Sequence, residues 1–141
     1  MAFYTFSKFW KINVIMLVKE FMNTDFLSHS CLTNLPLEDA IAQMEDTGCI
    51  FVISKKNKLS GIITDGDLRR LKHKENPEKL AVTDVMNTKP KWARETDKLI
   101  NIYKFMISKN LNILPVLDSE NRVVGFLSIH QLTRIFSPER I

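Results

Sequence analysis

The sequence predicts a mixed α/β fold of the α+β kind, in which two β-α-β-β-α units pack about a pseudo-twofold axis. Its main support is an internal repeat, because the stretch from Gly61 to Leu68 recurs from Gly125 to Leu132, a displacement of 125 − 61 = 64 residues. Two copies of one supersecondary unit therefore make up the chain. A three-stranded sheet with helices on one face leaves its other face uncovered, and pairing two units covers both. The same displacement relates Val18 to Val82, Met22 to Met86, Val52 to Val116, Asn57 to Asn121, and Arg70 to Arg134.

The first repeat shows a helix followed by two apolar strands and a second helix. Pro36 suits the first turn of a helix whose apolar residues share one face, and Gly48 ends it. Asp65-Gly66 is a turn dipeptide between the last strand and the last helix. The expected elements are a lead-in at 18–22, an irregular segment, a helix at 36–47, strands at 50–53 and 59–64 joined by a turn at 55–58, and a helix from 67 to about 74.

The second repeat keeps this order. Lys89-Pro90 breaks regular structure after the lead-in, and the following helix carries an apolar inner face. The expected elements are a lead-in at 82–86, a helix at about 97–110, strands at 113–117 and 122–127 joined by a turn at 118–121, and a helix at about 129–137. The predicted organisation is an aromatic-rich N-terminal segment at 1–17, the first repeat at 18–74, a linker at 75–81 and the second repeat at 82–137.

The N-terminal segment, residues 1–17, is rich in aromatic residues at helical spacing, which predicts an apolar face packed on the module or on a partner subunit. A helix on a membrane surface is the alternative, although Lys8 and Lys11 make only a thin polar face. The segment has no cleavage site of the signal-peptide kind and is too interrupted to span a bilayer. We therefore expect no membrane partner.

The composition is that of an ordinary globular protein. Of 141 residues, 45% are hydrophobic and 26% are charged, which argues against disorder. The net charge of +4 is mildly basic and is weak support for nucleic-acid binding. Cys31 and Cys49 lie outside any metal-ligand or redox spacing, so they indicate reduced thiols and a cytoplasmic location.

Thr64 and Asp67 have the spacing of a capping box, in which both side chains only satisfy backbone donors at a helix start. The alternative is a binding role, because a helix start also favours an anion such as phosphate. Spacing alone leaves both interpretations open.

Catalysis finds little support in the sequence. The four glycines are all used by turns, so a phosphate-cradling glycine-rich loop is missing, and the three histidines are scattered without metal-ligand spacing. Neither a serine nor a cysteine lies in a recognisable nucleophile setting. We therefore predict a binding protein without catalytic residues or a metal site, and we expect it to require no cofactor.

Each repeat resembles the cystathionine-β-synthase (CBS) domain, and the tandem pair resembles a Bateman module. The likeness rests on Val-x-x-x-Met at the head of each repeat, on Leu114-Pro115-Val116, and on Gly-hydrophobic-hydrophobic-Thr/Ser-x-x-Asp, and it covers about residues 18 to 137. More narrowly, Thr-Asp-Gly-Asp-Leu-Arg-Arg at 64–70 is similar to the regulatory tail of sugar-phosphate isomerases of the arabinose-5-phosphate isomerase type.

The resemblance implies a nucleotide in the cleft between the two halves. Asp67 would accept hydrogen bonds from both ribose hydroxyls, Thr64 would contact the phosphate and Ile62 the base. A carboxylate suits a vicinal diol, because charge-assisted hydrogen bonds are stronger than neutral ones. The opposite half is expected to complete the site with Asn87, Thr88, Lys91, Asn112 and Ile113.

The second motif departs from the family pattern, since it has Ser128 and then Gln131 in place of the aspartate. A neutral amide is a weaker acceptor for a diol. We therefore expect one competent site at Thr64 and Asp67, and an impaired or empty second site at Ser128 and Gln131.

By resemblance, the ligand would be AMP, ADP, ATP, S-adenosylmethionine or a nucleotide-sugar such as CMP-Kdo. The module would form a homodimer and would control a catalytic partner or partner domain of the isomerase type. The isomerase catalytic domain is absent from this sequence, so we expect either a truncated tail or a free-standing regulatory module.

Two further hypotheses stay open. In the first, the chain is a dimerisation or assembly module whose nucleotide clefts are vestigial. In the second, the basic cluster between Lys55 and Lys74 binds single-stranded nucleic acid. The cluster lacks interleaved aromatic residues, so the stacking platforms of such proteins are missing and no nucleic-acid partner is expected.

Overall fold

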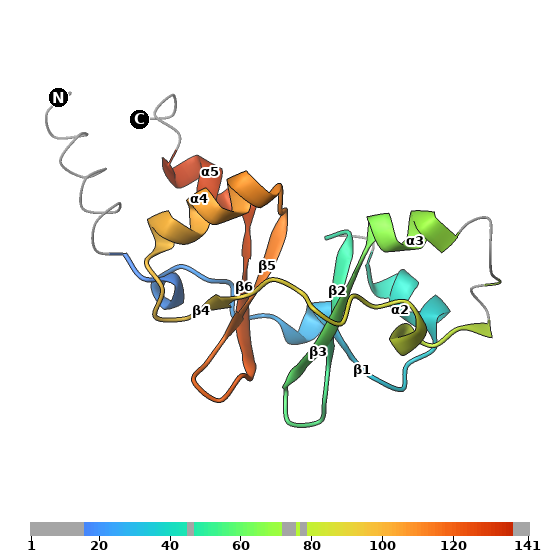
Figure 1. The fold of residues 1–141 in the computed structure, drawn as a ribbon. Coiled ribbons are helices and arrows are strands. Elements are labelled where there is room, and N and C mark those ends of the chain that lie inside the picture. The colour runs from blue at the N-terminus through green and yellow to red at the C-terminus, as the bar shows by residue number, and fades with distance from the viewer. Residues whose placement is uncertain (1–15, 45–46, 72–75, 77–78, 137–141) are drawn as a thin grey trace, which may run out of the picture. The chain divides into compact units, whose positions relative to one another are not determined.

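The computed structural model describes residues 16–44, 47–71, 76 and 79–136, which form two compact units (Figure 1). The β1–β3 unit comprises described residues within 25–91 together with 120–123. The β4–β6 unit comprises 16–24, 92–119 and 124–136. Each contains one three-stranded sheet, with strand orders β1-β2-β3 and β4-β5-β6. The predicted mixed α/β class is confirmed.

In the β1–β3 unit, β1 runs parallel to β2, and β2 pairs antiparallel with β3. The five residues of β2 are all buried, as their apolar sequence predicts. The hairpin between β2 and β3 turns at Asn57, whose φ of 62° is tolerated better by asparagine than by most residues. The elements are η2 (Leu27–His29), β1 (Ser30–Leu32), α2 (Leu37–Gln43), β2 (Cys49–Ile53), β3 (Leu59–Thr64), α3 (Asp65–Leu71) and η4 (Val82–Asp84).

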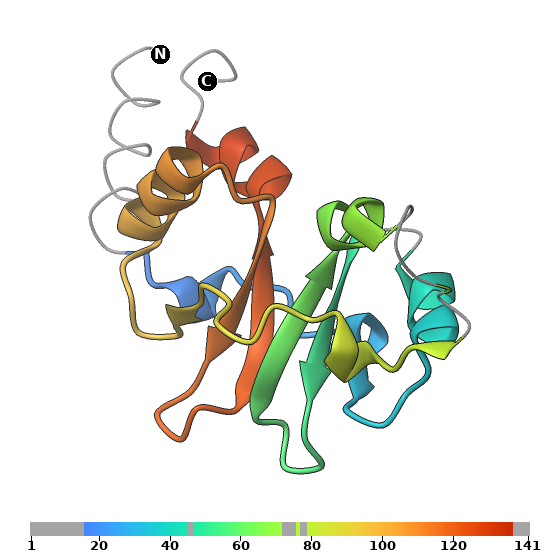
Figure 2. The ribbon, with the colours of Figure 1, turned by 45° about the vertical axis from the view of Figure 1, so that its right-hand side comes forward.

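In the β4–β6 unit, α4 and α5 lie side by side (Figures 1 and 2), and the rings of Tyr103 and Phe136 stack with centroids 4.9 Å apart. α4 ends where Asn110 takes a left-handed conformation at φ 55°, a common way to stop a helix. The elements are η1 (Val18–Glu20), β4 (Ala93–Arg94), α4 (Leu99–Lys109), β5 (Ile113–Leu117), β6 (Val123–Ser128) and α5 (Ile129–Phe136).

The structure agrees with the predicted strands at 59–64 and 113–117, and it locates two strands, the first of each predicted β-α-β-β-α unit, whose residues the sequence pattern did not identify. These are β1, with three residues, and β4, with two, each pairing in parallel at the edge of its sheet. α3 begins at Asp65, two residues earlier than predicted. Residues 1–15 and 72–75, where an N-terminal apolar helix and the end of α3 were expected, lie outside the described residues.

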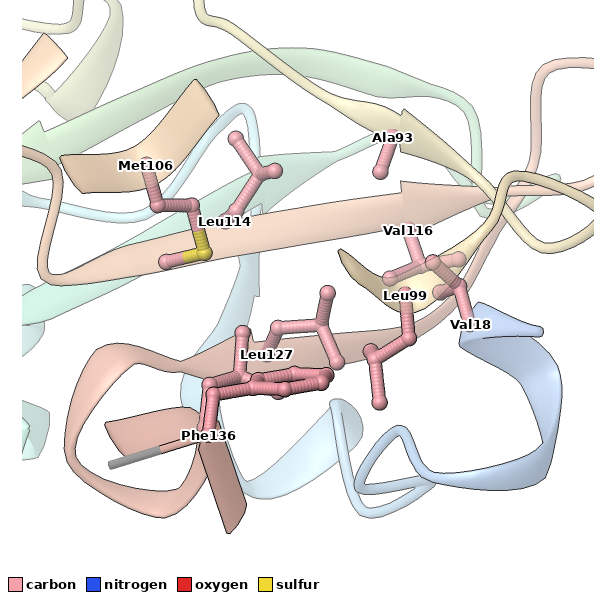
Figure 3. Packing of buried hydrophobic residues seen from close by; sticks show 9 residues of the cluster. Val18, Ala93, Leu99, Met106, Leu114, Val116, Leu127 and Phe136 are labelled. Atoms are coloured by element: carbon pink, nitrogen blue, oxygen red, sulfur yellow. The ribbon is translucent and has the colours of Figure 1, made fainter. Parts of the chain in front are cut away.

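The lead-in of each repeat packs into the core formed by the other repeat's sheet. Val18, at the head of the first repeat, is fully buried in the β4–β6 unit with Leu99 and Val116 (Figure 3). Val82, at the head of the second repeat, is fully buried in the β1–β3 unit with Leu37. Because each core includes a lead-in from elsewhere in the sequence, neither unit is one continuous repeat.

Two glycines that were assigned to turns from the sequence lie within strands instead, and they let these lead-ins approach the strands. A Cβ on Gly61 of β3 would lie 2.8 Å from the carbonyl oxygen of Asn87, and a Cβ on Gly125 of β6 would lie 2.8 Å from that of Asn23. In each case the lead-in asparagine exchanges two backbone hydrogen bonds with the residue after the glycine, at 2.9–3.1 Å. Glycine is needed here because any side chain would push the two backbones apart.

Candidate functional site

The turn from β3 into α3 is closed by Thr64 and Asp67. Asp67 Oδ2 accepts the backbone N–H of Thr64 at 2.8 Å and its hydroxyl at 3.1 Å, while the N–H of Asp67 points at Thr64 Oγ1 at 3.4 Å. This is the reciprocal pattern of a capping box. Thr64 and Asp67 therefore cap the start of α3 in the structure. If they also bind a ligand, they must do so while keeping this capping role.

The other carboxylate oxygen of Asp67 pairs with Arg70. The guanidinium donates to Asp67 Oδ1, and the side chains of Asp67 and Arg70 are 12% and 73% exposed. Arg70 was not among the predicted site residues, although opposite charges three residues apart on a helix are an established signal for such a pair. The carboxylate thus lies near the surface with an exposed counter-ion.

Ile62 and Asn87 hold the lead-in beside the motif. Their backbones exchange two hydrogen bonds, at 3.1 and 2.9 Å. The side chain of Ile62 is largely buried, at 8% exposed, so only its edge is available to a ligand. Asn87 is exposed, and its Oδ1 accepts the N–H of Lys89 at 3.0 Å.

The structure divides the remaining predicted site residues between the two units. Thr88 and Lys91 are exposed and belong, like Thr64 and Asp67, to the β1–β3 unit. Asn112 and Ile113 belong to the β4–β6 unit, where the carbonyl of Asn112 accepts the N–H of Ile129 at 2.9 Å. Their contribution to the site stays a prediction.

The second motif lacks the bonds of the first. Ser128 ends β6 and Gln131 is exposed on α5, and within the described part of the chain no hydrogen bond joins their side chains. Side-chain length does not explain the difference, because glutamine is longer than aspartate. The neutral amide of Gln131 gains less from a backbone N–H donor than the carboxylate of Asp67 does. Beside Gln131 lies a hollow of about 400 Å³, lined by Phe21, Asn23, Gln131, Arg134 and Ile135.

The two cysteines are buried in the β1–β3 unit. Burial raises the pKa of the Cys31 thiol to about 11. Burial likewise raises the pKa of the Cys49 thiol to about 11, to which the nearby Asp65 carboxylate contributes. At neutral pH both are therefore protonated, in keeping with a packing role rather than with nucleophilic chemistry.

The described residues contain no group of three or more histidine, cysteine, aspartate or glutamate side chains placed to hold a metal ion. Among the same residues, no helix combines the length and the apolar character that crossing a bilayer requires.

A family comparison accounts for both repeats. The family model of the CBS domain matches residues 18–74 and again residues 82–138. The chain belongs to the CBS-domain family. The family model matches twice in succession, so the chain carries a tandem CBS pair.

Among curated proteins, the CBS pair is similar to the arabinose 5-phosphate isomerase KdsD of Pseudomonas aeruginosa. The two are 32% identical over 106 residues, which cover 73% of this chain and 32% of the isomerase. The chain spans about a third of the length of the curated relatives that it matches.

Among solved structures, the CBS-pair protein CBSX2 of Arabidopsis thaliana, solved in complex with AMP, superimposes with a TM-score of 0.73 at 22% identity, covering 85% of this chain and 95% of that one. The CBS pair of the protein MJ0100, solved with 5′-methylthioadenosine and S-adenosylmethionine, gives a TM-score of 0.74 at 22% identity, covering 89% and 98%. At such identities the likeness establishes the fold.

Proposed function

We propose that this CBS pair is a regulatory module that binds an adenine nucleotide or a related nucleotide at Asp67. The observation that carries the proposal is the carboxylate itself: it lies 12% exposed in the first turn of α3, fixed in place by two hydrogen bonds from Thr64. A preorganised carboxylate is a good acceptor for the vicinal hydroxyls of a ribose, because little ordering remains to be done on binding. Relatives of the same fold have been solved with AMP or S-adenosylmethionine.

In this proposal Asp67 accepts ribose hydroxyls, Thr64 contributes to phosphate recognition and the edge of Ile62 contacts the base. Asn87, Thr88 and Lys91 complete the surface around the motif, with Asn112 and Ile113 as further contacts. Thr64 Oγ1 already donates to Asp67 Oδ2 and would keep that bond, sharing its hydrogen with a phosphate oxygen in a three-centre hydrogen bond. Ser128 and Gln131 form an impaired counterpart, and the working stoichiometry is one nucleotide per chain.

The candidate ligands are AMP, ADP, ATP, S-adenosylmethionine and CMP-Kdo. The likeness to an arabinose 5-phosphate isomerase supports a sugar-phosphate isomerase, in the same polypeptide or as a separate protein, as the regulated enzyme. We further propose that the module acts as a homodimer. No cofactor is required for this role.

A second candidate, an assembly module with vestigial nucleotide sites, has one observation in its favour. The Asp67 carboxylate already accepts three hydrogen bonds, two from Thr64 and one from Arg70, so its bonding is satisfied by capping and an ion pair alone. Under this alternative Asp67 matters for stability and for nothing else.

Calorimetric titration with the five candidate ligands separates the two functions. We expect one ligand to bind near one equivalent per chain, and Asp67→Asn to weaken it at least tenfold, because the amide loses the charge and half of the acceptor capacity. The matched control is Gln131→Asn in the second motif, which should change the affinity less than about twofold. If a folded chain shows saturable binding that Asp67→Asn leaves intact, the proposed site is wrong; if no ligand binds, the assembly role is favoured.

A further inference from the structure

The contact between Arg70 and Asp67 limits what the carboxylate can accept. A carboxylate offers about four lone-pair positions, two on each oxygen. Thr64 uses both positions of Oδ2, through its N–H and its hydroxyl, and Arg70 uses one position of Oδ1. One acceptor position is left. The two hydroxyls of a ribose need two, so a full ribose contact requires Arg70 to leave.

Arg70 is placed to leave easily. Its side chain is 73% exposed, and ion pairs of this kind between residues three apart on a helix surface contribute little to stability. Its guanidinium also has a natural alternative partner in a phosphate, which it can bind through two parallel hydrogen bonds.

The surroundings of Arg70 are positively charged. A Cβ placed on Gly66 would lie 3.9 Å from a guanidinium nitrogen of Arg69 and 3.9 Å from one of Arg70, and 3.6 Å from the Thr64 hydroxyl. Both arginine side chains therefore fold back toward the start of α3, next to Thr64 and Asp67. Arg69 makes no ion pair with any described residue. An anion reaching Thr64 would meet two guanidinium groups.

We propose that Arg70 makes the site selective for phosphorylated nucleosides by exchanging partners. In the free protein the guanidinium occupies an acceptor position of Asp67. A phosphate on the ligand draws it away, and the freed position takes the second ribose hydroxyl. A nucleoside without a phosphate, or one with a positively charged group in its place, has to displace Arg70 without compensation. This inference rests on the proposed nucleotide site at Asp67.

The test compares AMP with adenosine by calorimetry in the full chain. We expect the wild type to bind AMP at least tenfold more tightly than adenosine, since a phosphate adds charge-assisted hydrogen bonds. In Arg70→Gln, AMP should weaken about tenfold while adenosine tightens two- to fivefold, because Asp67 is no longer occupied. Arg70→Gln is an exposed substitution, and circular dichroism verifies that the variant is folded.

Two control variants distinguish an exchange of partners by Arg70 from simple electrostatic attraction between an arginine and the phosphate. Arg69→Gln removes the same charge from the same end of α3 without freeing an acceptor, so it should not tighten adenosine. Arg134→Gln, the equivalent change in the second repeat, should leave both affinities within about twofold. Adenosine binding that stays unchanged or weakens in Arg70→Gln would overturn the exchange, whatever happens to AMP.

Asp67→Asn distinguishes a failure of this inference from a failure of the proposed function. If AMP binding depends on Asp67 while Arg70→Gln leaves the ratio of the two affinities unchanged, only the exchange is wrong. If AMP binds equally well to wild type and Asp67→Asn, or binds to neither, the nucleotide site at Asp67 is wrong and the exchange fails with it.

Discussion

The turn from β3 into α3 and the turn from β6 into α5 have the same backbone arrangement but differ in their side chains. Each strand carries a glycine, Gly61 or Gly125, against which a lead-in backbone packs with two hydrogen bonds. At the helix start, however, the first turn has Asp67 bonded to Thr64, whereas Gln131 is exposed and unbonded to Ser128. The backbone arrangement therefore maintains the fold in both repeats, and the carboxylate is an addition to one of them.

The largest expected effect is a loss of stability when the strand glycines that both turns have in common are replaced. Gly61→Ala and Gly125→Ala should each destabilise the protein by about 2–3 kcal/mol, because the new methyl group would meet a backbone oxygen that cannot move without breaking the lead-in hydrogen bonds. The contact is 2.8 Å in both cases, so the two costs should agree within about 0.5 kcal/mol. Urea unfolding followed by circular dichroism measures both.

Gly66→Ala is the matched control for these two substitutions. A Cβ at this helical position would have no neighbour closer than 3.6 Å, so alanine should be neutral or stabilise by up to about 1 kcal/mol. A large cost at Gly61 with none at Gly125 would show that the two turns do not share a common packing arrangement.

A smaller loss of stability is expected when the side chains that differ between the two turns, Asp67 and Gln131, are replaced. Asp67→Ala should cost about 1–2 kcal/mol, because the Thr64 N–H loses its acceptor at the start of α3. Gln131→Ala should cost less than about 0.5 kcal/mol, since its side chain caps nothing in the structure. The same unfolding experiment provides both values. Equal costs would mean that Gln131 caps α5 in solution and that the motifs are more alike than the structure indicates.

The sequence was sufficient for the features that are repeated and periodic. The displacement of 64 residues identified both motifs, and apolar runs located the buried strands correctly. It was not sufficient for β1 and β4, since two or three residues are too few for a period to be visible. Nor could it show that Val18 packs in the β4–β6 unit, because a repeat reveals which residues are equivalent and not which sheet each one covers.

The repeat also concealed a local difference. Gly48 and Asn110, which both have positive φ after a helix, are 110 − 48 = 62 residues apart, whereas the strands that follow begin at Cys49 and Ile113, 113 − 49 = 64 apart. The second repeat therefore has two more residues between helix and strand, just before the predicted site residue Ile113. In the candidate site, the charge of Asp67 was predictable from its motif, but its pairing with Arg70 depends on a side-chain conformation that the motif does not specify.

The smallest expected effect concerns two thiols that only the β1–β3 unit contains, since Ala93 and Ile113 hold the equivalent positions in the other. The pKa of Cys49 rises from 9.0 to about 11 on folding, and that of Cys31 does the same. The folded state thus favours the neutral thiol, so its contribution to stability is complete below pH 9 and is lost as the pH rises through 11. For Cys49 the loss should reach up to about 1 kcal/mol by pH 10.

Urea unfolding at pH 8 and at pH 10 checks this, with each protein compared with its own value at pH 8. The double variant Cys31→Ala/Cys49→Val should lose less stability over this interval than the wild type, because the two proteins share every other ionisable group and only the wild type contains the thiols. An identical loss would mean that the thiols are as accessible to water in the folded chain as in the unfolded one. That result would contradict the burial of β2, whose closely packed side chains support β3 and, through it, the backbone position of Thr64.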